Sequence, residues 1–463
     1  MDTKAQHPAR ALPDTEALAK RIKNLALRDT NVVVASVVIS NLLRAVSSVI
    51  LTRLLMPEMF GIAGIIASIQ FSVAMASDMG FQAFVVRHAD GDKPRFLDTV
   101  WTIALARSLL LTVVVVALAA PLAHMLDKPD LTPIIAVSAL SFCIDGLSSL
   151  TLLTAIRRRM ILRLSVLELI VMITQIVFTA ALAFLWRSYW ALLLGSLAGC
   201  ILKVVLSYTM FEGSRRRLAW DDGYARELWS FARFVTGSSL IFLLVAQFDK
   251  VVLARVMPLD LFGLYVLAGT LASAPLAFAS GYASRVLYPR YAELFREQCV
   301  DLKEAYYAKR RLPSLLYTFL TGGFIGSAGL IIDILYDERY AEAAVYLRIL
   351  AIAPLFALAS NSANEALIAT GRISVTLQAS VVKLIWLVFA CPTLYAIEGP
   401  LGIVLAVGLM EVPALLLKWV RMHHVSLLDL RQELLFVAAG GAGILCGFAG
   451  EWAVDALLSR LPR

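Results

Sequence analysis

Long apolar runs dominate this chain and restrict it to one class of fold. From Asn31 onward, stretches of 18 or more mostly apolar residues recur between short polar loops. A helix of that length crosses a bilayer core of about 30 Å, and the runs lack the period-2 alternation of a membrane β-strand. Only 16% of the 463 residues are charged, whereas soluble domains carry about a quarter. The sequence therefore predicts an all-α polytopic membrane protein.

The apolar runs divide into two sets of six, with one run left over. The first set predicts an N-lobe at 31–211, with spanning helices at 31–55, 60–86, 97–122, 131–155, 162–186 and 189–211. The second predicts a C-lobe at 229–421, with helices at 229–255, 261–288, 312–335, 344–369, 373–397 and 400–421. A basic segment at 1–30 precedes the lobes, a linker at 212–228 joins them, and an additional C-terminal membrane helix follows at 434–457.

A short motif is repeated at the same place in both sets. Residues 52–61 read Thr-Arg-Leu-Leu-Met-Pro-Glu-Met-Phe-Gly, and residues 254–263 read Ala-Arg-Val-Met-Pro-Leu-Asp-Leu-Phe-Gly. Both contain arginine, Met-Pro and Phe-Gly in that order, between two apolar runs. Two halves built on one plan predict two pseudo-symmetric six-helix bundles with a transport site between them.

Basic residues occupy every second loop, which sets the predicted orientation. They lie in the N-terminal segment and at Arg87, Lys93, Arg95, Arg157, Arg158, Arg159, Arg163, Arg215, Arg216, Arg217, Arg285 to Arg311, Lys418, Arg421 and Arg431. This alternation predicts a cytoplasmic N-terminus. The net charge of +8 then reflects contacts with anionic membrane lipids, above all at the arginine triplet of the linker, and we expect no nucleic-acid partner.

Charged residues inside the predicted spans mark the candidate site, because a charge in the bilayer core costs about 3 kcal/mol or more unless it faces protein or water. In the first span, Ser36, Ser40, Arg44 and Ser47 lie within about 80° of one another around the helix axis. Such a stripe is typical of a cavity wall that receives an anionic substrate. The alternative is a packing stripe of small residues with one buried ion pair.

Further candidates lie in the seventh and tenth spans. We expect Asp249 to couple transport to a H⁺ or Na⁺ gradient and Lys250 to bind phosphate; the alternative is an ion pair that locks two helices. Asn361 and Glu365 are four residues apart on one helix face. We interpret Asn361 as a substrate ligand and Glu365 as a second ion-coupling candidate.

Four more residues complete the candidate set. Arg107 is a further cation for the cavity. Arg53 and Arg255 fall at matching helix ends, where they act in gating or extend to the membrane surface, and Asp78 is a helix-terminus or gating residue. The sequence shows no nucleophile–base set, phosphate loop or metal cluster, so we predict no catalytic residue, no metal and no cofactor.

Several of these segments resemble polysaccharide transporters, including Wzx-type oligosaccharide-lipid flippases, of the multidrug/oligosaccharidyl-lipid/polysaccharide exporter superfamily. The similar segments are Phe248-Asp249-Lys250 through Phe262-Gly263-Leu264-Tyr265, Pro275, Ser284-Arg285-Val286-Leu287-Tyr288-Pro289, Asp78-Met79-Gly80-Phe81, Thr99-Val100-Trp101, Ala106-Arg107-Ser108 and Arg157-Arg158-Arg159-Met160. Ala254 departs from the glycine often found at its position. The likeness is diffuse and extends from about Asn31 to Val420.

The resemblance implies two lobes in a V, a central cavity lined by helices 1, 2, 7 and 8, and alternating access. It implies a secondary transporter rather than an enzyme, in the bacterial cytoplasmic membrane. The expected cargo is a polyprenyl-diphosphate-linked oligosaccharide for exopolysaccharide, capsule or O-antigen, delivered to polymerase or export machinery. Two alternatives stay open: a cation-coupled multidrug exporter of the same superfamily, and a membrane-embedded glycosyltransferase or polymerase.

Overall fold

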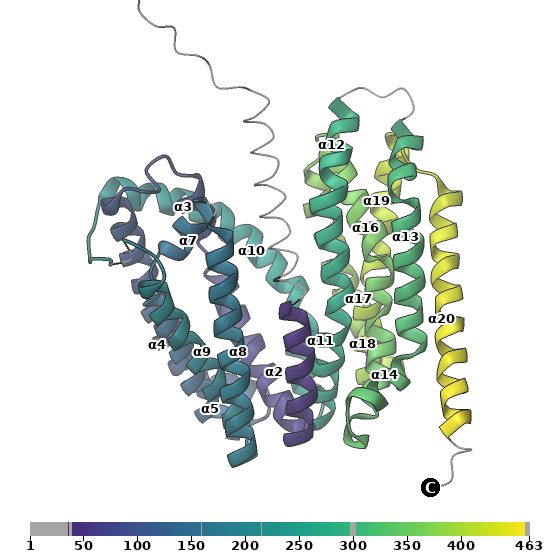
Figure 1. The fold of residues 1–463 in the computed structure, drawn as a ribbon, viewed down its shortest axis with the longest axis horizontal. Coiled ribbons are helices and arrows are strands. Elements are labelled where there is room, and N and C mark those ends of the chain that lie inside the picture. The colour runs from purple at the N-terminus through teal and green to yellow at the C-terminus, as the bar shows by residue number, and fades with distance from the viewer. Residues whose placement is uncertain (1–35, 37–38, 159, 214, 297–301, 459–463) are drawn as a thin grey trace, which may run out of the picture.

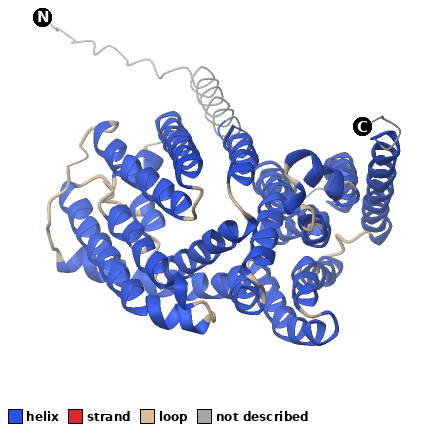
Figure 2. Cartoon of the chain, turned by 90° about the horizontal axis from the view of Figure 1, so that it is seen from below, coloured by secondary structure: helices blue, strands red, loops and turns tan. Residues whose placement is uncertain are grey.

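The structure, a computed structural model, describes residue 36 and residues 39–458 except 159, 214 and 297–301. Figure 2 shows helices and loops throughout this part of the chain. Within it, nine helices are long and apolar enough to cross a membrane, or up to eleven if each bent pair counts as one span. The predicted all-α, multi-pass fold is therefore confirmed. The predicted basic segment at 1–30 lies outside the described residues.

The N-lobe is built from shorter pieces than predicted. Its elements are a helix at 39–54, α2 (Pro57–Ala76), α3 (Phe81–Arg87), α4 (Pro94–Met125), η1 (Pro129–Leu131), α5 (Thr132–Ser138), α6 (Leu140–Gly146), α7 (Thr151–Arg157), α8 (Ile161–Trp186) and α9 (Trp190–Thr209). The predicted second span breaks between α2 and α3, where Gly80 adopts φ 66° and donates its N–H to Asp78 Oδ1 at 2.9 Å. Glycine adopts this left-handed conformation without the steric penalty of a Cβ.

The C-lobe also contains bent spans. Its elements are α10 (Asp222–Val256), α11 (Leu259–Tyr282), a π-helical turn η2 (Ala283–Leu287), α12 (Tyr288–Arg296), α13 (Leu302–Gly326), α14 (Ala328–Leu335), η3 (Glu338–Tyr340), α15 (Ala343–Leu350), α16 (Ile352–Ala369), α17 (Ser374–Glu398), α18 (Pro400–Gly408), α19 (Glu411–His424) and α20 (Leu430–Leu458). Because α10 begins at Asp222, it takes in the last part of the predicted linker. Arg216, in the rest of that linker, is buried 3.7 Å from Asp98 rather than extended toward lipid.

The two lobes meet at one end of the molecule and diverge toward the other (Figure 1). We call the meeting point, around Pro57 and Met257, the sealed end. The opposite end carries the basic loops and is called the basic end. Buried cores follow this division, because the largest hydrophobic cluster joins residues of both lobes, such as Ile65 and Phe262. At the basic end, a cluster around Phe96 joins N-lobe helices to the start of α10, and a second cluster around Tyr306 lies within the C-lobe.

The additional helix α20 lies at the margin of the C-lobe, far from the N-lobe (Figure 2). It packs along α13 through glycines on both helices; for example, a Cβ on Gly322 would overlap the backbone of Gly440. Small residues allow such close backbone approach between membrane helices. An ion pair between Arg310 and Glu433 at 3.0 Å, with both side chains at most 1% exposed, fastens α20 to α13 near the basic end.

Candidate functional site

The sealed end is centred on the two glycines of the repeated motif. Gly61 of α2 and Gly263 of α11 lie back to back where the two helices cross: a Cβ on Gly263 would be 2.9 Å from the Gly61 nitrogen, and one on Gly61 would be 3.2 Å from the Gly263 nitrogen. The same added atoms would overlap carbonyl oxygens of Leu259 and Pro57. The repeated Phe-Gly of the sequence thus lies at a close backbone contact between the lobes.

Polar side chains from each lobe cap a helix end of the other lobe at the sealed end. Lys128 of the N-lobe donates to the carbonyl oxygen of Ala254 at 2.6 Å, in the last turn of α10. From the C-lobe, the Tyr340 hydroxyl donates to the Leu55 carbonyl at 2.9 Å, and the hydroxyls of Tyr336 and Ser48 are 3.0 Å apart. Partial burial lowers the pKa of Lys128, an effect that neighbouring Asp127 opposes. Terminal helix carbonyls lack intrahelical partners, so these contacts join the lobes without any covalent or metal link.

Helix α10 belongs to both lobes. Near its middle, Thr236 donates to the backbone oxygen of Asp78 at 2.6 Å, and Ser239 donates to the Asp78 carboxylate at 2.8 Å. Its second half packs against α17 and α18 of the C-lobe. Asp78, predicted as a helix-terminus or gating residue, therefore connects the α2–α3 break to α10.

Asp249 lies in that second half of α10 and is buried. The hydroxyl of Tyr265 on α11 donates a hydrogen bond to its carboxylate. Within the described residues, no lysine, arginine or histidine lies close enough to form an ion pair with Asp249, and neighbouring Lys250 instead reaches back to the Ala246 carbonyl at 3.3 Å. The alternative role, an ion pair of Asp249 with a lysine or arginine that holds two helices together, is therefore not found among the described residues.

Arg44 is exposed on the helix at 39–54. This helix contacts both lobes near the sealed end through Leu51 and Ser48, whereas its other half exposes apolar side chains such as Leu42. Arg44 makes no ion pair or hydrogen bond with any residue that the structure describes. Neither Arg44 nor Lys250 thus forms an ion pair within the described residues, and their role in substrate binding stays a prediction.

Arg107, by contrast, is engaged in an internal contact. Its guanidinium donates to the carbonyl oxygens of Ser77 and Ala74 at 2.7 and 3.0 Å, and to the Ser77 hydroxyl at 2.8 Å. These groups end α2, so Arg107 neutralises unpaired carbonyls at a helix C-terminus. These contacts favour a structural role for Arg107. Its predicted role in substrate binding therefore has less support than the same role for Arg44.

A buried charge cluster lies inside the C-lobe, apart from the contact between the lobes. Glu411 of α19 pairs with Lys383 of α17 and accepts a hydrogen bond from Ser360 of α16 at 3.0 Å. Lys418 donates to the hydroxyl of the same serine at 2.8 Å. Lys383 and Glu411 fall inside predicted spans, whereas Lys418, expected among the basic loop residues, is buried within α19. The pairing depends on how the helices pack.

The remaining candidates take separate positions. Asn361 and Glu365 are half-buried on α16, and the Asn361 side chain has no hydrogen-bond partner among the described residues. Arg53 is exposed at the sealed end, and Arg255 forms an exposed ion pair with Asp127 at 3.3 Å. No group of three or more His, Cys, Asp or Glu suited to a metal ion occurs within the described residues.

Comparison with known proteins decides the family. The profile of the family described as "Polysaccharide biosynthesis protein" matches residues 50–345, which include the repeated motif, the sealed end and α10. The chain belongs to the polysaccharide biosynthesis protein family. The chain is similar to the teichuronic acid biosynthesis protein TuaB of Bacillus subtilis, with 21% identity over 64% of this chain. It is also similar to the lipopolysaccharide biosynthesis protein WzxC of Escherichia coli, with 20% identity over 80% of this chain. The match spans 61% of the TuaB sequence and 77% of WzxC.

Solved structures show that this polysaccharide biosynthesis protein shares its fold with membrane transporters. The lipid II flippase MurJ in an inward closed conformation has a TM-score of 0.71 at 13% identity, with 93% of each chain covered. An inward-facing multidrug resistance transporter of the MATE family has a TM-score of 0.62 at 12% identity, covering 84% of this chain and 95% of its own. Both likenesses agree with the predicted two-lobe helical architecture.

Proposed function

We propose that this protein is a flippase that moves a polyprenyl-diphosphate-linked oligosaccharide across the bacterial cytoplasmic membrane for surface polysaccharide synthesis. The observation that carries the proposal is the contact between Gly61 and Gly263. It belongs to a set of non-covalent contacts that close one end of a two-lobe transporter fold, and such contacts can open and reform without chemical change. The family and the WzxC and MurJ likenesses support the same function.

The positive-inside rule places the basic end in the cytoplasm. With that orientation, the lobes are joined at the outer face and diverge toward the cytoplasm, where lipid-linked sugars are assembled. The structure then corresponds to an inward-facing state. Transport requires the sealed end to open while the lobes approach each other at the basic end.

The substrate assignment rests on charge. A diphosphate needs cations, and Arg44 and Lys250 are available on two helices that approach the lobe junction. The polyprenyl tail stays in the lipid, so only the head group has to pass between the lobes. The protein is a transporter rather than an enzyme, and it delivers its cargo to polymerase or export machinery on the outer side.

Asp249 is the proposed coupling group. A buried carboxylate that accepts a hydrogen bond from a hydroxyl and forms no ion pair within the described residues favours uptake of H⁺ or Na⁺, and its contact with Tyr265 ties that event to α11. Since α10 also reaches the N-lobe through Ser239, a change at Asp249 acts on a helix that joins both lobes. Glu365 is the second coupling candidate.

A cation-coupled multidrug exporter is the second candidate, favoured by the fold shared with the MATE transporter and by the acidic Asp249. Arg44 and Lys250 argue against it, because they would repel the cationic drugs that such exporters carry. A glycosyltransferase or polymerase has less support, since the connections at the sealed end are short, as at Leu126–Lys128.

The decisive experiment measures how much lipid-linked oligosaccharide reaches the outer leaflet of a deletion strain. Complementation with wild type restores surface exposure, and Arg44→Ala restores at least tenfold less while inserting normally. Arg372→Ala, which removes an exposed arginine between α16 and α17, is the control and behaves as wild type. If the deletion strain never accumulates inward-facing glycan, the flippase proposal fails and drug efflux becomes the function to test.

A further inference from the structure

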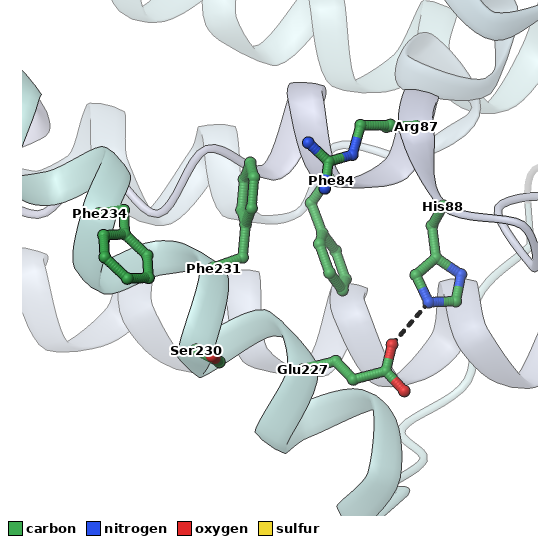
Figure 3. A pocket seen from close by; sticks show the side chains of 7 residues that line it. All are labelled: Phe84, Arg87, His88, Glu227, Ser230, Phe231 and Phe234. Carbon is green, nitrogen blue, oxygen red and sulfur yellow. Dashed lines mark hydrogen bonds and ion pairs between the residues drawn. The ribbon is translucent and has the colours of Figure 1, made fainter.

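A cavity of about 570 Å³ lies at the basic end, between α3 of the N-lobe and the first turns of α10. Figure 3 shows its walls: Phe84, Arg87 and His88 on one side face Glu227, Phe231 and Phe234 on the other. None of the residues predicted to bind substrate lies in it. The cavity is therefore separate from the lobe junction but shares α10 with it.

Three aromatic rings give the cavity flat apolar surfaces. Phe84 is buried and lines the cavity, and the ring of the fully buried Phe96 stacks on it with centroids 5.5 Å apart. Phe231 stands beside Phe84 with ring centroids 5.7 Å apart. Phe234 is 68% exposed.

Polar groups at the edge of these rings have hydrogen-bonding atoms that are not fully used within the described residues. His88 accepts the Asp90 N–H on Nδ1 at 3.0 Å, so its proton is on Nε2, which donates to Glu227 Oε2 at 2.8 Å. This leaves Glu227 Oε1 without a partner among the described residues. The Arg87 guanidinium lies 5.8 Å from the Phe231 ring centroid and has no ion pair in the described chain. The Ser230 hydroxyl lies with Glu227 on the wall formed by α10.

We infer that this cavity binds a hexopyranose unit of the oligosaccharide head group before it enters the lobe junction. A pyranose presents an apolar C–H face, which packs on Phe231 and Phe234, and a rim of hydroxyls. Glu227 accepts from those hydroxyls, and Arg87 donates to them. A phosphate is disfavoured because the Glu227 carboxylate faces it. This inference rests on the proposed flippase function and adds a specificity site for the sugar.

The test compares binding of two classes of lipid to the full-length protein in detergent micelles by native mass spectrometry. One probe is undecaprenyl diphosphate; the others are the same lipid linked to glucose, galactose or N-acetylglucosamine. Wild type binds at least one sugar-bearing lipid about tenfold more tightly than the sugarless lipid. Glu227→Gln and Phe234→Ala remove this preference and leave affinity for the sugarless lipid unchanged. Trp229→Ala, an exposed aromatic of the same helix outside the cavity, keeps the preference.

Each other outcome has a definite meaning. If wild type prefers none of the three sugars, or if both cavity variants retain the preference, the sugar site is wrong while the flippase proposal stands. If wild type binds none of the four lipids and the deletion strain exposes glycan normally, the proposed function itself is wrong. A loss of affinity for the sugarless lipid in the variants also overturns the inference, because it shows that the cavity binds the diphosphate.

Discussion

Gly61 and Gly263 occupy equivalent places in the two halves of the repeat and contact each other across the crossing of α2 and α11. Each glycine meets the backbone at the start of the opposite helix, so the contact is reciprocal. Neither position leaves room for a Cβ. The two equivalent positions of the sequence repeat therefore form part of the surface on which the two lobes close.

The first prediction concerns this contact. Gly263→Val places a side chain against the Pro57 backbone, which cannot move aside as a flexible side chain would, and should hold the sealed end open. A cysteine introduced at Ser48, which contacts Tyr336 across the lobes, should then react with a membrane-impermeant maleimide several-fold faster. Gly281→Val is the control, because a Cβ at Gly281, in the same helix, meets no atom within 4 Å. Equal labelling in both variants would show that the glycine contact does not close the lobes.

The second prediction concerns Asp249. Asp249→Asn should retain lipid binding but lose the response of transport to an imposed H⁺ or Na⁺ gradient. An uncharged amide lacks the negative charge with which the carboxylate takes up H⁺ or binds Na⁺. Tyr265→Phe should shift the ion dependence without abolishing it, since only the hydrogen bond is lost. Transport in proteoliposomes under each gradient checks both. Asp333→Asn, which removes an exposed carboxylate of α14, should leave the response intact.

The third prediction concerns the attachment of α20. Glu433→Gln leaves the buried Arg310 without its counter-charge, and loss of one partner of a buried pair costs about 3–5 kcal/mol. The midpoint of thermal unfolding in detergent should fall markedly. The double variant Arg310→Met/Glu433→Leu should recover most of that loss, because no buried charge is left unpaired. Asp337→Asn, at the exposed pair with Arg339, should change the midpoint little.

The fourth prediction concerns pH at the basic end. Asp90 accepts hydrogen bonds from Lys93 and from Tyr224 at 2.8 Å, and these contacts lower the pKa of its carboxyl from 3.8. A lowered pKa in the folded state stabilises the fold above the unfolded value and loses that effect as pH falls through the folded value. Wild type should therefore exceed Asp90→Asn in thermal stability at pH 6, and the difference should shrink below pH 3.8. A constant difference across this range would assign the effect to packing.

Prediction from sequence succeeded where a pattern persists over a whole element. Apolar runs indicated the approximate place of most spans, and the repeated Phe-Gly indicated two related lobes. Their number was overestimated: thirteen spans were predicted, and the described residues contain nine candidate spans, or up to eleven if each bent pair counts as one. The bends escaped prediction, because a turn such as that between α6 and α7, which bends the span by 57°, replaces only a few apolar residues. The partners of the buried charges could not be predicted either. Lys383 and Glu411 are 28 positions apart, and their contact forms only when α17 and α19 pack together.

Residues that close the sealed end were the largest omission. Lys128 and Tyr340 looked like ordinary loop residues, since nothing in a sequence marks a side chain that caps a helix of the other lobe. The cavity at the basic end was missed for a similar reason. Phe84 and Phe234 belong to separate apolar runs, and their proximity follows from the break at Gly80, which reorients α3 toward α10.

Helix α10 has a mechanical consequence for the whole molecule. It is one unbroken helix of 35 residues, about 50 Å long, fastened to the N-lobe near Ser239 and embedded in the C-lobe at Asp249. A stiff rod held at two points transmits a tilt at either point to the other. A displacement of α10 at the basic end therefore also moves Asp249, by an amount that depends on the short stretch of helix between the two points.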